Sequence, residues 1–155
     1  MAELDRIDRR ILDILQREGR ISMTELGERI GLSTSPCAER VRRMERSGVI
    51  TGYHARVDPK ALGRTLLVFV EITLSAKSGE VFDAVRKALL HMPEVMECHL
   101  VSGSFDYLVK ARLSEMAEYR NLLGDILKRI PVPCQSHSYV VMEEVKETTA
   151  LVVPT

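Results

Sequence analysis

In the first third of the chain, apolar residues recur every three or four positions, which is the spacing of one face of an α-helix. The first such stripe predicts a helix over about residues 4–18, ended by Gly19. A second, shorter helix is predicted to begin at Ser22 as its N-cap, with Glu25 as the partner of a capping box. Gly31 follows this helix and tolerates a positive φ, so the chain can turn sharply there.

A third helix is predicted to start within Ser33–Pro36, because proline fits the first helical turn, whose amides have no acceptor within the helix. One side of this helix is apolar and faces the other two helices, with Cys37, Val41 and Met44 at helical spacing. The opposite side is polar and rich in arginine. It carries Ser35, Glu39, Arg42 and Arg46, with Arg43 at its edge.

Two short helices joined by a glycine turn, the second basic on its outer side, are typical of a helix-turn-helix. Gly27 fits this arrangement, because the crossing of the two helices leaves room for only a small side chain. An α-helix fits the major groove, where its first turns meet base edges while hydroxyl and guanidinium groups bind phosphates. We therefore expect a domain over 1–48 that binds double-stranded DNA. Its candidate contact residues are Ser33, Thr34, Ser35, Glu39, Arg40, Arg42, Arg43 and Arg46. The alternative is a merely solvated helix face, since such faces also occur in proteins that bind no DNA.

After residue 65 the pattern changes to the alternation of a strand with one buried face, and strands and helices then follow each other to the end of the chain. The predicted elements are a strand at 66–74, a helix capped by Ser78, strands at 95–101 and 107–113 around a turn at 102–106, a helix capped by Ser114, a strand at 135–144 and an added edge strand at 151–153. The second of these helices is expected to bury Met116, Tyr119, Leu123, Ile126 and Leu127.

This order predicts a ferredoxin-like βαββαβ sandwich of the α+β class over 65–155, joined to the first domain by a strand and linker at 49–64. The two helices cover one face of the sheet. The other face carries apolar residues, so we expect a second subunit to cover it.

Composition narrows the classes of protein further. With 45% apolar and 28% charged residues the chain is globular, and no apolar run approaches a membrane span. The N-terminus lacks the pattern of a signal peptide, so we expect a cytoplasmic protein. Three widely spaced cysteines do not form a disulfide framework, and Cys134 with His137 is a poor metal site without a second pair. Residues 1–64 hold 13 Lys/Arg against 10 Asp/Glu, an excess in the domain expected to bind DNA.

Several runs of the chain resemble the Lrp/AsnC family, the feast/famine regulators, and in particular its leucine-responsive subgroup. They are Leu4–Asp8, Gly19–Ser22, Gly31–Glu45, Leu67–Ile72, Glu97–Gly103, Phe105–Tyr107 and Tyr139–Glu144, and the likeness extends over nearly the whole chain. The resemblance implies a winged or extended helix-turn-helix and a ligand-binding (RAM) domain. It also implies homodimers paired through their C-terminal sheets and gathered into octamers or higher assemblies, with an amino-acid effector between dimers.

The resemblance also places an effector pocket near the turn between the second and third strands. By matching position, the pocket residues are Leu100, Gly103, Ser104, Asp106, Met116, Tyr139, Val140 and Val141. Their chemistry agrees, because amides at Gly103 and Ser104 suit an α-carboxylate and Asp106 suits an α-ammonium group. Each residue also has a purely structural interpretation, such as Asp106 accepting hydrogen bonds from the turn. Ser104 and the segment 131–135 depart from the usual family pattern, which bears on ligand selectivity.

Taken together, the sequence predicts a sequence-specific transcription regulator of amino-acid metabolism genes that responds to leucine or another apolar amino acid. It predicts no catalytic constellation, no metal site and no cofactor. Two alternatives remain at this stage. One is an architectural DNA-bending protein without a ligand, and the other is an amino-acid-sensing regulatory subunit that acts on an enzyme by protein contact.

Overall fold

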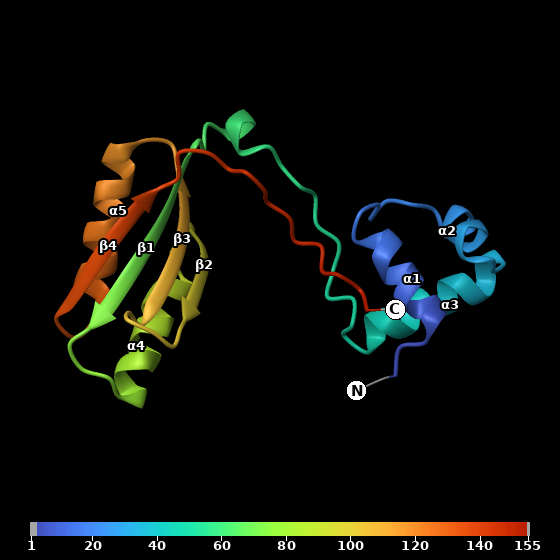
Figure 1. Cartoon of the computed structure of the whole chain (residues 1–155), viewed down its shortest axis with the longest axis horizontal. Coiled ribbons are helices and arrows are strands. Elements are labelled where there is room, and N and C mark those ends of the chain that lie inside the picture. The colour runs from blue at the N-terminus through green and yellow to red at the C-terminus, as the bar shows by residue number, and fades with distance from the viewer. Residues whose placement is uncertain (1–2, 155) are drawn as a thin grey trace. The chain divides into compact units, whose positions relative to one another are not determined.

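A computed structural model describes residues 3–154, and the chain divides into two compact units (Figure 1). One unit is Val57–Val145, and the other combines the chain up to Arg56 with the tail from Lys146 onward. The side-chain amide of Gln16, the C-cap of the first helix, forms two hydrogen bonds with this tail. It donates to the Leu151 carbonyl oxygen at 3.1 Å and accepts from the Leu151 amide at 2.6 Å. The predicted boundary, by contrast, kept the tail with the C-terminal domain.

The N-terminal unit contains three helices, α1 (Arg6–Leu15), α2 (Met23–Ile30) and α3 (Thr34–Arg46). Their buried faces form one core of Ile11, Leu15, Leu26, Ile30, Cys37, Val41 and Met44, so the predicted stripes are confirmed. Gly31 ends α2 with a φ of 79°, as the turn requires. Ser22 caps α2 by accepting from the Glu25 amide, but the Glu25 carboxylate pairs with Arg29 instead of closing a capping box.

The strand expected within 49–64 is absent. Residues 51–58 have no regular secondary structure, and they are followed by one 3₁₀ turn, η1 (Pro59–Leu62). An extended segment becomes a strand only when its backbone groups pair with a neighbour, and within the described residues no segment pairs with this one. The prediction of a strand within 49–64 is therefore wrong.

The C-terminal unit is a four-stranded antiparallel sheet in the order β2-β3-β1-β4, covered by two helices (Figure 1). Its elements are β1 (Leu66–Leu74), α4 (Gly79–Leu90), β2 (Val95–Leu100), β3 (Tyr107–Leu113), α5 (Met116–Arg129) and β4 (Cys134–Val140). The predicted ferredoxin-like topology is confirmed. The last strand ends at Val140 and not at residue 144, and residues 151–153 form no edge strand.

The start of α5 differs from the prediction. Its N-cap is Glu115, and the amide and hydroxyl of Ser114 both donate to the Glu118 carboxylate at 2.8 and 2.6 Å. Met116 is 55% exposed, whereas Leu122, absent from the predicted stripe, is buried. Helical spacing identifies a face of a helix, but it does not say how far along that face the neighbouring layer extends.

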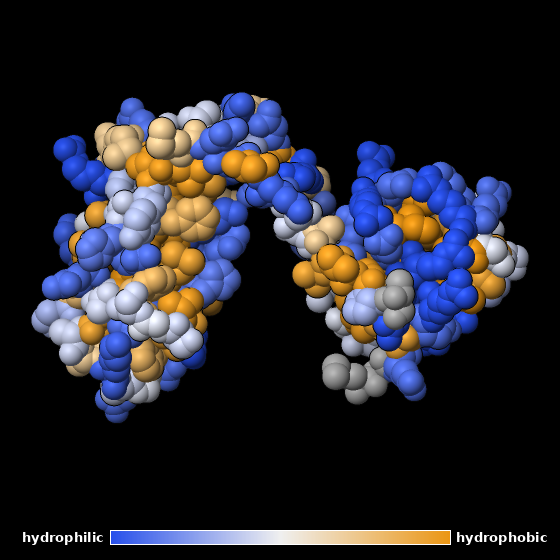
Figure 2. Space-filling model, in the orientation of Figure 1, coloured by the Kyte–Doolittle hydropathy of each residue, from blue (hydrophilic) through white to orange (hydrophobic). Residues whose placement is uncertain are grey.

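The face of the sheet opposite the helices carries both apolar and charged side chains. Strand alternation places Leu67 and Phe69 there, together with Glu71 and Lys110 on the same face. Figure 2 shows this mixture as orange surface interrupted by blue. None of the helices within residues 3–154 combines the length and apolarity of a membrane span.

Candidate DNA-binding face and effector site

The outer side of α3 presents the polar residues that the sequence predicted there. Ser33 is the N-cap of α3, yet its side chain makes no capping hydrogen bond. Thr34 donates to the Thr24 hydroxyl at 3.3 Å, which joins α3 to α2. Ser35 is exposed, and the side chains of Arg42 and Arg46 are each 66% exposed. This end and side of α3 are therefore accessible to a nucleic acid.

Glu39 forms ion pairs with the two exposed arginines of this face. Its carboxylate accepts from Arg46 at 2.7 Å and lies 3.9 Å from the Arg42 guanidinium. The hydrogen bond from Arg46, followed by the attraction of both arginines, lowers the pKa of Glu39. Because Glu39 is itself 61% exposed, these ion pairs are weak, and either arginine can turn to another anion at little cost.

The other two arginines of α3 are bound to the first turn of α1. Arg40 donates to Asp5 at 2.5 Å and to Asp8 at 2.9 Å, and Arg43 donates to Asp8 at 2.5 Å. Asp8 is completely buried. The structure thus divides the four arginines predicted to contact DNA into an outward pair, Arg42 and Arg46, and a pair bound to α1.

The predicted effector residues form two groups. The first group lies at the turn between β2 and β3, where Leu100, Gly103 and Ser104 are exposed. Asp106, at the end of this turn, is only 5% exposed. Its carboxylate accepts from the Leu74 amide and pairs with Lys77, each at 2.8 Å. Burial disfavours its charge, but these two partners outweigh burial and lower the pKa of Asp106.

The second group lies around the end of β4 and the start of α5. Val140 pairs with Val68 near the beginning of β1, and the Val141 amide donates to the Leu67 carbonyl oxygen. Tyr139 is 51% exposed and donates to Glu71 at 3.1 Å, while Met116 begins α5.

The two groups occupy opposite ends of the same sheet. Asp106 binds the backbone of β1 at Leu74, whereas Val141 binds it at Leu67. These points lie seven positions apart along the strand, which is roughly 20 Å at the rise of a β-strand. Figure 1 shows the β2–β3 turn and the end of β4 at opposite ends of the sheet. A single C-terminal unit therefore does not gather these residues around one amino acid.

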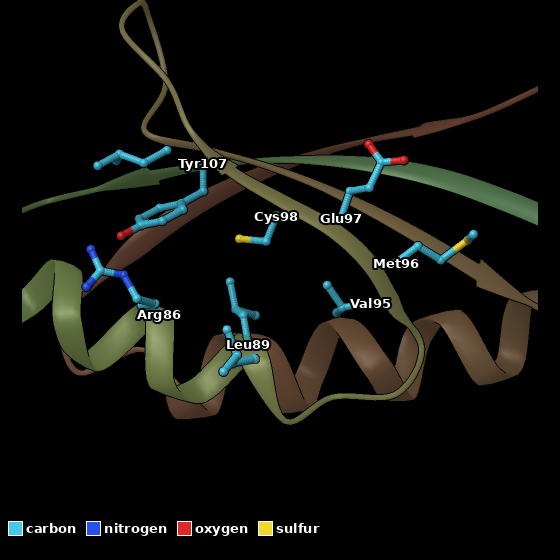
Figure 3. Close-up of a pocket in the computed structure, with 9 residues that line it drawn as sticks. Arg86, Leu89, Val95, Met96, Glu97, Cys98 and Tyr107 are labelled. Carbon is cyan, nitrogen blue, oxygen red and sulfur yellow. The ribbon is translucent and has the colours of Figure 1, made fainter. Parts of the chain in front are cut away.

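A cavity of about 310 Å³, which the sequence did not predict, lies between α4 and β2. Figure 3 shows Cys98 and Tyr107 of the sheet opposite Leu89 and Arg86 of α4. Of the predicted effector residues, only Leu100 lines this cavity. Leu90 and Met96 are apolar, exposed and line this cavity, so they are the signal in the sequence that could have indicated it.

The described residues contain no group of three or more His, Cys, Asp or Glu side chains placed to hold a metal ion. The cysteines Cys37, Cys98 and Cys134 are all free. Cys134 and His137 are three positions apart on β4, and strand alternation directs them to opposite faces of the sheet.

Comparison with known proteins identifies both units. Residues 4–51 match a winged helix-turn-helix DNA-binding family, and residues 67–151 match the Lrp/AsnC ligand binding domain. The chain is 54% identical over 153 residues to the leucine-responsive regulatory proteins of Klebsiella pneumoniae and of Escherichia coli K12. Each alignment covers 99% of this chain and 93% of the relative.

Solved structures agree with this result. A transcriptional regulator of Neisseria meningitidis, solved as a complex with L-Met, superposes with a TM-score of 0.90 at 31% identity over 97% of both chains. The feast or famine regulatory protein of M. tuberculosis complexed with L-methionine gives a TM-score of 0.88 at 32% identity, covering 98% of this chain and 100% of the other.

The two units together define a DNA-binding transcription regulator with an amino-acid-binding domain. The chain belongs to the Lrp/AsnC family. Its relatives are transcription regulators and not enzymes.

Proposed function

We propose that this protein is a cytoplasmic, homo-oligomeric regulator that binds operators of amino-acid metabolism genes and responds to leucine or another apolar amino acid. The observation that carries this proposal is the division of the effector residues between opposite ends of the sheet. A pocket that needs both groups must combine the β2–β3 turn of one subunit with the β4–α5 end of another. Ligand binding and assembly are then coupled, because the ligand favours the assembly that completes its pocket.

DNA binding uses α3 in the major groove, with two-fold related helices reading two half-sites. Support comes from the exposed Ser35, Arg42 and Arg46 and from the free hydroxyl at the helix N-cap. Arg42→Gln is expected to weaken binding to an operator selected from a random duplex library. Arg86→Gln is a matched control, because Arg86 is also 66% exposed and also pairs with an acidic residue three positions away, on α4 of the other unit.

The ratio of operator to random-duplex affinity at physiological salt tests whether this binding is sequence-specific. A ratio above roughly 10³ is expected of a regulator. Equal affinities for the operator and the random duplex would favour an architectural DNA-bending protein. If Arg42→Gln and Arg86→Gln lose the same amount of operator affinity, Arg42 does not contact DNA and α3 is not the DNA-binding helix.

The shared pocket is tested by mixing subunits. Ser104→Arg blocks the turn side and Met116→Arg blocks the α5 side, and both residues are exposed, so the fold tolerates the change. Each variant alone is expected to lose the thermal shift that millimolar leucine or methionine gives the unaltered protein. After mixing in equal amounts and reassembly, about a quarter of the sites combine two intact sides, and binding partly returns. No recovery would place the pocket within one chain.

The oligomer is proposed to be an octamer or a higher assembly of dimers paired through the open sheet faces. Phe69 and Leu108, which are apolar and only partly buried on that face, support pairing. Sedimentation with and without leucine measures the subunit number. A monomer under both conditions would contradict the shared pocket.

A further inference from the structure

We infer that Asp8 is a positioning residue that withholds Arg40 and Arg43 from DNA, leaving the phosphate contacts of α3 to Arg42 and Arg46. This inference rests on the proposed binding of DNA by α3. Two arginines of α3 bind α1 within the domain, and the other two are left to bind the nucleic acid.

Both carboxylate oxygens of Asp8 are occupied. Oδ1 accepts from Arg40, and Oδ2 accepts from Arg43 and from the Asp5 amide at 3.2 Å. Asp8 is 0% exposed with both arginines in place, although the Arg43 side chain is itself 50% exposed. If one arginine turned to a DNA phosphate, this carboxylate would keep only the other, and the loss of an ion-pair partner from a buried carboxylate makes that exchange unfavourable.

The same residues also begin α1. Asp5 is its N-cap and accepts from the amides of Ile7 and Asp8, both at 2.8 Å, while Asp8 closes the capping box by accepting from the Asp5 amide. The acidic pair is thus held by backbone hydrogen bonds within its own helical turn, independently of its contacts with α3. A rigid first turn of α1 therefore sets the position of α3 through Arg40 and Arg43.

Arg42 and Arg46 differ in the partner that they would have to leave. Theirs is Glu39, which is 61% exposed and remains hydrated when an arginine turns away. The division limits the number of cations that reach phosphates. It therefore limits the sequence-independent part of binding, which grows with each phosphate contact.

The salt dependence of DNA binding tests this division, because the slope of log K against log salt changes by about 0.9 for each phosphate contact in duplex DNA. The full-length protein is titrated with an operator selected from a random library and with a random duplex of equal length. Arg43→Gln is expected to leave the slope unchanged, whereas Arg42→Gln reduces it by about 0.9. Asp8→Asn is expected to steepen the slope by about 0.9 for each released arginine and to raise the affinity for the random duplex.

The double variant Asp8→Asn with Arg43→Gln is expected to have a slope that is less steep by about 0.9 than the slope of Asp8→Asn alone. If Arg43→Gln in the otherwise unaltered chain reduces the slope as much as Arg42→Gln does, Arg43 touches DNA and the inference is wrong. If Asp8→Asn lowers thermal stability without any change of slope, Asp8 is only structural, and the inference is again wrong.

Two further results are decisive. If Asp8→Asn does not fold, an unchanged slope in Arg43→Gln beside a reduced slope in Arg42→Gln still supports the inference. If both single arginine variants leave the slope unchanged, α3 does not bind phosphates. The proposed function then fails at the DNA-binding face, and the inference fails with it.

Discussion

The ammonium group of Lys77 lies 2.8 Å from the carboxylate of Asp106. It occupies the position expected for the α-ammonium group of an effector. Asp106 is buried, whereas the Lys77 side chain is 53% exposed, so Lys77 is the partner that can leave. An effector that pairs with Asp106 must displace this lysine.

Lys77→Met is therefore expected to tighten the binding of leucine or methionine. A competing ion pair with one exposed partner has a free energy of up to about 1 kcal/mol, which corresponds to a gain in affinity of roughly two- to five-fold. Isothermal titration measures it, with Lys87→Met on the exposed side of α4 as the control. Unchanged or weaker binding in Lys77→Met would show that the effector ammonium does not use Asp106.

Asp106 also has a structural role, because it satisfies the Leu74 amide at the end of β1. Asp106→Ala is expected to lower the free energy of unfolding by about 1–3 kcal/mol, since the buried amide loses its acceptor. Asp106→Asn keeps an acceptor oxygen and should lose less. Urea denaturation measures the free energy of unfolding of the two variants. If Asp106→Ala and Asp106→Asn are equally stable, the hydrogen bond to the Leu74 amide contributes nothing to stability.

Gly27 and Gly124 are both helical glycines, and alanine should have opposite effects at them. A Cβ atom on Gly27 would meet the Leu32 carbonyl oxygen at 2.6 Å, so Gly27→Ala is expected to destabilise the protein by about 1–3 kcal/mol. A Cβ atom on Gly124 meets nothing within 4 Å, so Gly124→Ala is expected to stabilise α5 by about 0.5–1 kcal/mol. Thermal unfolding of each variant tests the pair, and loss of stability in both would show that α5 does not accept a methyl group at Gly124.

Glu118 makes the C-terminal unit sensitive to acid. Hydrogen bonds from Ser114 and then from Arg64 lower the pKa of Glu118 from 4.5 to about 2. A carboxyl group whose pKa is lower in the folded state contributes stability above its unfolded pKa, and this contribution is lost as the pH falls from 4.5 toward 2. Glu118→Gln should therefore be less stable than the unaltered protein at neutral pH, and the difference should shrink as the pH falls through this range. A difference independent of pH would contradict this role.

Local patterns in the sequence were sufficient where a residue's environment depends on near neighbours. The spacing of Cys37, Val41 and Met44 identified the buried face of α3, and the alternation from Leu66 to Leu74 identified β1. Gly31 marked the turn between α2 and α3, because a positive φ is a property of the local backbone. The order of such elements was also enough to predict the ferredoxin-like unit.

The tertiary structure decided which distant groups meet. Helical spacing puts Arg43 at the edge of the outer face of α3 and Arg40 beside its core, but only the packing of α1 against α3 brings Asp8 to them. In the same way, matching by position assigned Asp106 and Val141 to one pocket, and only the tertiary structure shows that they lie at opposite ends of the sheet within one chain. Periodicity is a property of neighbouring residues along the chain, so it predicts helices, strands and their faces. The partner of a buried charge depends on how those elements pack, and spacing along the chain does not contain that information.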